Sequence, residues 1–161
     1  MWVILPGLVP AAVPADIGGA PRLRVETAKL LAGNHRLAEV SEALSGLAPD
    51  VLVLVELRPG ALAQLRAGGA FDGLTHSTVE GTPQDVEIFS RLPLRDVGRA
   101  VGLPELPQPR AVVDVGAIPV RLRGAHPLPP VSGYEDESRA SMAELADEVR
   151  AEALRCWWLA T

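Results

Sequence analysis

Cysteine, lysine and aromatic residues are scarce in this chain. Among its 161 residues, Cys156 is the only cysteine, Lys29 is the only lysine, and aromatic residues make up 4%. A single cysteine excludes an intrachain disulfide and a zinc site built from several cysteines. The three histidines, His35, His76 and His126, lie too far apart for a short metal-ligand motif. Small disulfide scaffolds and local zinc motifs are therefore excluded.

Several sequence motifs are also absent. The chain has no internal repeat, no glycine-rich phosphate loop and no Gly-x-Ser-x-Gly motif, so nucleotide-binding and serine-hydrolase folds lose their usual support. The net charge of -5 argues against a broad surface for non-specific nucleic-acid binding. The hydrophobic fraction of 48% and the charged fraction of 22% are typical of a globular chain, and the length allows one domain at most.

Residues 1–21 are an apolar lead-in that several prolines interrupt, with no basic residue before Arg22. The prolines prevent a continuous membrane-spanning helix, and the stretch lacks the basic start of a signal peptide. Two interpretations stay open. The lead-in is either the remnant of a membrane segment, so that a longer form associates with membranes, or a Pro-rich segment packed on the domain.

The next part of the chain has a β-α-β pattern. Residues 22–31 alternate like a strand, and residues 51–57 form an apolar run typical of a strand buried on both faces. Between them the spacing predicts a helix from His35, with inward-facing positions Leu37, Val40, Leu44 and Leu47. A second, short helix is predicted over residues 59–67, with Leu62 and Leu65 inward.

The remaining part predicts short strands and one long helix. Strands are expected at residues 75–80, 86–90, 110–115 and 118–123, and the last two are expected to form a hairpin. A helix is expected from about Ser138 to Leu154, with Met142, Leu145 and Val149 on its buried side. These elements together predict an α/β (α+β) fold.

Glu56 is the first candidate functional residue. It lies near the end of the apolar strand over residues 51–57, and an ionised carboxylate there is costly to bury unless a metal, a cation or water meets it. Ligands of open sheets collect beyond the carboxyl ends of the strands. The alternative is a glutamate that has simply reached solvent.

The order of these segments resembles the endonuclease/exonuclease/phosphatase superfamily, whose members have a DNase I-like fold. The resemblance covers residues 22–154: a first strand, a helix, a Pro-Asp-led strand ending in Glu56, the segment Ile88 to Leu94, and a strand leading to Ala125-His126-Pro127. It implies a partial DNase I-like β-sandwich flanked by helices, without the C-terminal portion of the domain.

The resemblance also implies a site. Glu56 matches the family's metal-binding glutamate, which implies Mg²⁺ as cofactor, since hard oxygen ligands suit this ion. His126 matches a histidine that contacts the scissile phosphate and takes part in acid–base chemistry, whereas Ser90 and Arg91 match a structural segment. The implied partner is a phosphate ester, from nucleic acid, lipid or a small molecule. A loop histidine hydrogen-bonded to the backbone is the alternative for His126.

Three departures from the family pattern imply that the chain is inactive or severely impaired. Lys29 stands where the family usually has an asparagine beside the metal, and its ammonium would compete with a cation. The Gly-Asp-x-Asn segment and the late Asp-His pair are absent. The missing half would also leave an exposed sheet edge that favours self-association. The alternative function is a non-catalytic α/β binding module or a protein fragment.

Residues 155–161 form an atypical tail. A shifted reading of GC-rich codons for Arg155 to Thr161 gives Val-Leu-Val-Val-Gly-Asp, the start of the missing motif, so we hypothesise a frameshift at or just before Arg155. The alternative is an ordinary amphipathic tail whose Trp157 and Trp158 pack on the sheet.

Overall fold

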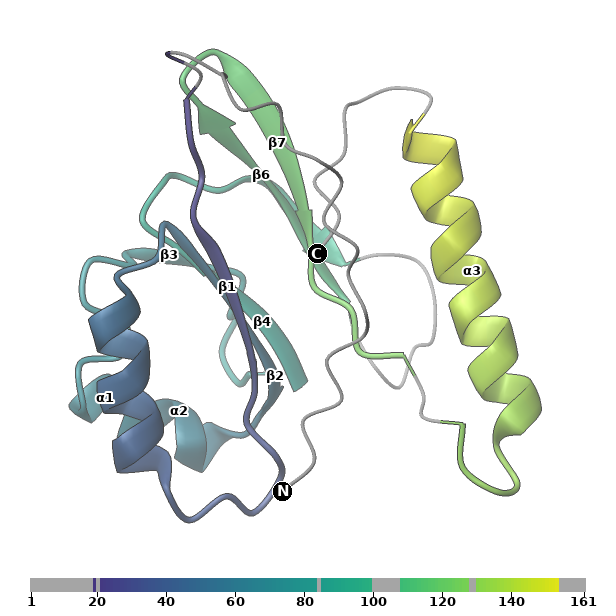
Figure 1. The fold of residues 1–161 in the computed structure, drawn as a ribbon, viewed down its shortest axis with the longest axis horizontal. Coiled ribbons are helices and arrows are strands. Elements are labelled where there is room, and N and C mark those ends of the chain that lie inside the picture. Colours follow the sequence, from purple (N-terminus) through teal and green to yellow (C-terminus); the bar gives the residue numbers. More distant parts are fainter. Residues whose placement is uncertain (1–18, 20, 84, 100–107, 128–129, 154–161) are drawn as a thin grey trace.

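The fold consists of two packed sheets with helices on both outer sides. The computed structural model describes residues 19, 21–83, 85–99, 108–127 and 130–153 (Figure 1). A four-stranded sheet has the order β1-β2-β4-β3, and a three-stranded sheet has the order β5-β6-β7. Helices α1 and α2 cover the outer face of the four-stranded sheet, and α3 lies on the far side of the other sheet (Figure 1). This arrangement confirms the predicted α+β class.

The predicted β-α-β unit is present. Strand β1 (Val25–Lys29) runs parallel to β2 (Val51–Leu57), and α1 (Leu37–Leu47) connects them. Strand β2 is buried on both faces along most of its length, as its apolar run predicts. Parallel pairing brings the carboxyl ends of β1 and β2 together, with Lys29 opposite Val55.

Helix α2 (Pro59–Ala67) packs beside α1 over the sheet. Its Leu62 and Leu65 are buried as predicted and join Leu44 of α1 and Leu54 of β2 in one apolar cluster. Gly68 ends α2 against Ser41, where a Cβ atom would lie 2.3 Å from the serine Oγ. Glycine at this position therefore allows the two helices to approach closely.

Strands β3 (His76–Ser77) and β4 (Asp85–Ser90) complete the first sheet. β4 pairs antiparallel with β2, and the register shifts between Leu54 and Leu57 of β2. β3 is shorter than the strand predicted over residues 75–80, because its ladder with β4 has two residue pairs and the chain then bends.

The second sheet consists of β5 (Arg95–Arg99), β6 (Pro109–Val115) and β7 (Ile118–Arg123). The predicted hairpin joins β6 to β7 in antiparallel register, with Val115 opposite Ile118. Gly116 turns the chain there with a φ of +64°, which favours glycine. β5 was not predicted, because its residues are mostly charged and exposed and pair with β6 through the backbone.

The two sheets enclose a second apolar cluster. Val51 and Val53 of β2 and Val86 and Ile88 of β4 are buried between the sheets, and Leu122 of β7 packs against them from the other side. Face-to-face packing of two sheets confirms the predicted sandwich.

Helix α3 (Glu135–Ala153) begins about three residues before the predicted start. Its predicted buried side is wrong at Met142, whose residue is 50% exposed, while the small residues Ser138 and Ser141 are buried. Leu47 of α1 was also predicted to face inward but is 43% exposed, because the helix ends there and Ala48 takes a left-handed conformation. The side chain of Val149 lies outside the described part of the chain.

Two terminal predictions fall outside the described residues. These are the lead-in, apart from Gly19 and Pro21, and the tail with Trp157 and Trp158. Among the helices that the structure describes, none is long and apolar enough to cross a membrane.

Candidate functional site

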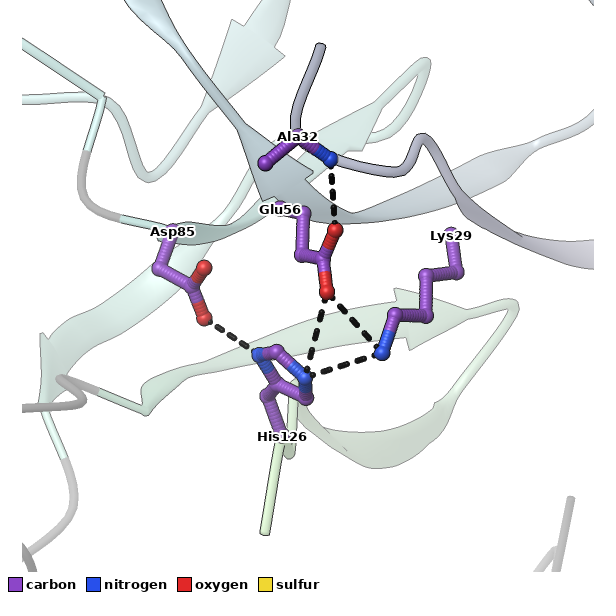
Figure 2. A network of polar contacts seen from close by, with 5 residues as sticks. All are labelled: Lys29, Ala32, Glu56, Asp85 and His126. Carbon is purple, nitrogen blue, oxygen red and sulfur yellow. Dashed lines mark hydrogen bonds and ion pairs between the residues drawn. The ribbon is translucent and has the colours of Figure 1, made fainter. Parts of the chain in front are cut away.

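Four polar side chains from separate segments meet where β1 and β2 end (Figure 2). Lys29 is the last residue of β1, Glu56 lies near the end of β2, and Asp85 opens β4. His126 follows β7 and reaches across to the first sheet. The sequence separation is as large as 97 residues, between Lys29 and His126. The fold, rather than local sequence, therefore assembles the cluster.

Both carboxylate oxygens of Glu56 have partners. Oε1 lies 2.9 Å from the ammonium of Lys29, and Oε2 accepts a hydrogen bond of 2.7 Å from the backbone N–H of Ala32. The Lys29 hydrogen bond is the largest cause that lowers the pKa of Glu56, the Ala32 N–H lowers it further, and partial burial opposes both. Glu56 is therefore held as a carboxylate.

The imidazole of His126 lies between two carboxylates. Its Nδ1 is 2.7 Å from Oδ2 of Asp85, and its Nε2 is 3.3 Å from Nζ of Lys29 and 3.8 Å from Oε1 of Glu56. In the neutral tautomer with the proton on Nδ1, the ring donates to Asp85 and accepts from Lys29. Asp85 thereby fixes the orientation of the ring and leaves Nε2 facing the lysine.

Gly124 lets the chain that carries His126 press against the first sheet. A Cβ atom at this glycine would lie 2.6 Å from Cγ1 of Val86 and 3.1 Å from Cγ of Pro109. The backbone N–H of Gly124 also donates to the carbonyl oxygen of Pro109 at 2.9 Å. The chain two residues before His126 therefore lies close against Val86, the residue after Asp85.

The backbone of the site is strained. Among the described residues, five that are not glycine have a positive φ, and three of these belong to the site or adjoin it: Leu31 at +63°, Glu56 at +60° and Asp85 at +61°. Such conformations cost about 1 to 3 kcal/mol each and cluster at functional sites. Glu56 also lies within the register shift between β2 and β4, and Asp85 pairs with Leu57 at its end; such irregularities re-aim side chains.

The residues present do not fit Mg²⁺. The ion needs several oxygen ligands, but both oxygens of Glu56 already meet donors, and one of these donors, Lys29, is itself a cation. In the described part of the chain no three His, Cys, Asp or Glu side chains are grouped to hold a metal ion. Glu56 as a metal ligand stays a prediction.

The structure brings the two predicted site residues, Glu56 and His126, together. It leaves the other histidines elsewhere: His35 is exposed, and His76 pairs with Ser90 at the opposite end of the sheet. Lys29 was predicted to oppose a cation and does contact Glu56. Sequence reasoning missed Asp85, whose one available signal was a carboxylate directly before the apolar strand over residues 86–90.

Ser90 and Arg91 lie away from the site, at the start of β2. The hydroxyl oxygen of Ser90 accepts the backbone N–H of Leu92, and the backbone N–H of Arg91 donates to the carbonyl oxygen of Asp50. These contacts hold the end of β4 against the turn before β2, which agrees with a structural role.

No family model matches the chain, and no curated protein matches it. Solved structures do. TDP2 from Caenorhabditis elegans superposes with a TM-score of 0.65 at 17% identity over 83% of this chain and 44% of that one. A beta toxin mutant from Staphylococcus aureus with bound magnesium ions gives 0.59 at 15% identity, over 81% and 59%.

An endonuclease/exonuclease/phosphatase family protein from Leptotrichia buccalis C-1013-b gives a TM-score of 0.54 at 9% identity, over 77% of this chain and 63% of that one. These three similarities show that the chain has the DNase I-like fold, as predicted. The chain spans between 44% and 63% of the length of these structures.

Proposed function

We propose that this chain is part of a phosphate-ester hydrolase and that the cluster of Lys29, Glu56, Asp85 and His126 is its phosphate-binding site. The observation that carries the proposal is the convergence of these four side chains beyond the carboxyl ends of β1 and β2, with Glu56 and Asp85 at strained backbone positions. Hydrolysis by this chain is expected to be weak, because the Gly-Asp-x-Asn and Asp-His motifs are absent from its sequence.

In the proposed chemistry His126 acts as a general acid. With a neutral imidazole the four side chains carry a net charge of about -1, which disfavours an anionic ester. Protonation of Nε2 removes this net charge, while Nδ1 keeps its contact of 2.7 Å with the carboxylate of Asp85. Binding of the ester is therefore expected to take up a proton.

Protonation also frees Lys29. An Nε2 that carries a proton no longer accepts an N–H of the ammonium, and the lysine side chain is 56% exposed and able to turn. Its ammonium then donates to a phosphate oxygen. Water attacks phosphorus and releases a proton to solvent, the bond to the leaving oxygen breaks, and Nε2 of His126 donates its proton to that oxygen.

A hydrolysis assay tests the proposal. We expect slow hydrolysis of a dialkyl phosphodiester, whose basic leaving oxygen needs a proton, and His126→Gln should reduce it to the uncatalysed rate, since general acid catalysis contributes about 10² to 10⁴-fold. His76→Gln is the matched control, because His76 lies at the other end of the sheet. Equal rates for the wild type and His126→Gln, together with no binding of the ester, would refute the proposal.

A non-catalytic binding module is the second candidate. The ion pair between Lys29 and Glu56 favours it, because a carboxylate already neutralised by a lysine needs no substrate or metal to satisfy it. Ester binding without turnover, unchanged in His126→Gln, would support this candidate over the hydrolase.

A further inference from the structure

We infer that the ammonium of Lys29 takes the place of a divalent cation at Glu56, so that this site carries its own tethered positive charge and excludes a metal ion. The inference deepens the proposed function and rests on it for its biological meaning. Its physical content, however, concerns the contacts of Glu56 alone and can be measured separately.

The position of the ammonium is set by the fold. Lys29 ends β1, Val55 is its register partner on β2, and Glu56 is the next residue, so parallel pairing places the two side chains at the same end of the sheet. Nζ lies 2.9 Å from Oε1, within hydrogen-bonding distance. The contact therefore depends on strand register rather than on a chance approach of two surface side chains.

The second oxygen of Glu56 is also occupied. Oε2 accepts the backbone N–H of Ala32 at 2.7 Å, in the loop that follows β1. A divalent cation would have to displace the ammonium from Oε1 or compete with this N–H at Oε2, and in both positions it would face a like charge nearby. The arrangement thus excludes a metal by both occupancy and repulsion.

Lysine suits this role better than arginine. An ammonium is a compact point charge with three N–H donors, whereas a guanidinium is a planar fork. Of the 15 lysine and arginine residues in the chain, the single lysine is the one in the site. Two of its three donors meet Glu56 and His126, which leaves the third to face a ligand such as a phosphate oxygen.

A Mn²⁺ titration tests the inference, with broadening of the Ala32 amide signal in NMR as the readout. Wild type and Lys29→Arg should show no site-specific broadening. Lys29→Met should bind Mn²⁺ at least about tenfold more tightly, because the repulsion is gone. The double variant that combines Lys29→Met with Glu56→Gln should lose this gain in Mn²⁺ affinity. Equal Mn²⁺ affinity of the wild type and Lys29→Met, measured at the Ala32 amide, would overturn the inference.

Two features keep the test decisive. If Lys29→Met does not fold, acetylation of the folded wild-type protein neutralises the same amine, because no other lysine is present. The readout is also independent of catalysis. If Lys29→Met gains Mn²⁺ affinity as expected but the protein binds no phosphate ester, the proposed function alone is refuted. If the wild type hydrolyses the ester with a metal ion bound at Glu56, this inference alone is refuted.

Discussion

Nδ1 of His126 lies 2.7 Å from Oδ2 of Asp85, 41 residues away in sequence and on the other sheet. This contact links the two sheets at the site and determines which ring nitrogen faces Glu56 and Lys29. An imidazole held in this way keeps one orientation. Asp85 is therefore a positioning residue for His126.

Asp85→Asn should weaken hydrolysis without unfolding the protein. The amide keeps the shape of the carboxylate but can present an N–H to Nδ1 and so favour the wrong tautomer of His126, which should lower the rate by between about tenfold and about 10⁴-fold. Separate measurement of kcat and KM checks the positioning role. The value of kcat should fall while KM changes little, and a loss that appears in KM alone would argue against a positioning role.

Removal of Lys29 should change how stability depends on pH. The folded-state pKa of Glu56 is lowered, chiefly by the Lys29 hydrogen bond, so its contribution to stability is present above its ordinary pKa and is lost as pH falls through the folded pKa. Lys29→Met should reduce this acid-dependent loss and cost about 0 to 1 kcal/mol at neutral pH, as for other partly exposed pairs. Urea unfolding at several pH values measures both effects. Identical pH dependence in the two proteins would contradict the account.

Gly124→Ala should destabilise the protein and displace His126. The new methyl group would lie 2.6 Å from Val86, and such overpacking costs about 1 to 3 kcal/mol. Gly46→Ala is the matched control, because a Cβ atom there meets nothing within 4 Å. Thermal unfolding should separate the two variants, with Gly46→Ala at least as stable as the wild type. Equal stability of the two variants would show that the close approach at Gly124 is unimportant.

Two leucines should differ sharply in their contribution to stability. Leu54 is fully buried beneath α1 and α2, and Leu54→Ala should cost about 2 to 5 kcal/mol through lost burial and a cavity. Leu47 is 43% exposed, so Leu47→Ala should change stability by no more than about 1 kcal/mol. Chemical denaturation measures both. A large cost for Leu47→Ala would support the inward position that its helical spacing predicted.

The sequence predicted the elements whose pattern is local. The apolar run of β2 and the proline start of α2 determine those elements, and their observed bounds, Val51–Leu57 and Pro59–Ala67, agree with the prediction. Strand β5 could not be predicted because its backbone pairing with β6 leaves no apolar pattern. Met142 was misassigned because helical spacing identifies a face but not whether another element covers it.

The site was predictable only in part. Glu56 could be identified as a charge within an apolar strand. His126 could be identified because the order of the segments around it resembles that of a known family. Asp85 was missed because its role depends on the pairing of β2 with β4 and on the approach of the chain after β7. The bond between Lys29 and Glu56 likewise follows from strand register, which single-sequence patterns do not reveal.

The ¹⁵N NMR signals of the three imidazole rings, followed during titration with dimethyl phosphate, test the central claim most directly. If the cluster binds phosphate esters, the His126 signals should shift toward the protonated form while those of His76 stay unchanged, because only His126 adjoins Lys29 and Asp85. No change at His126 at any ester concentration, or equal changes at His76 and His126, would contradict the account.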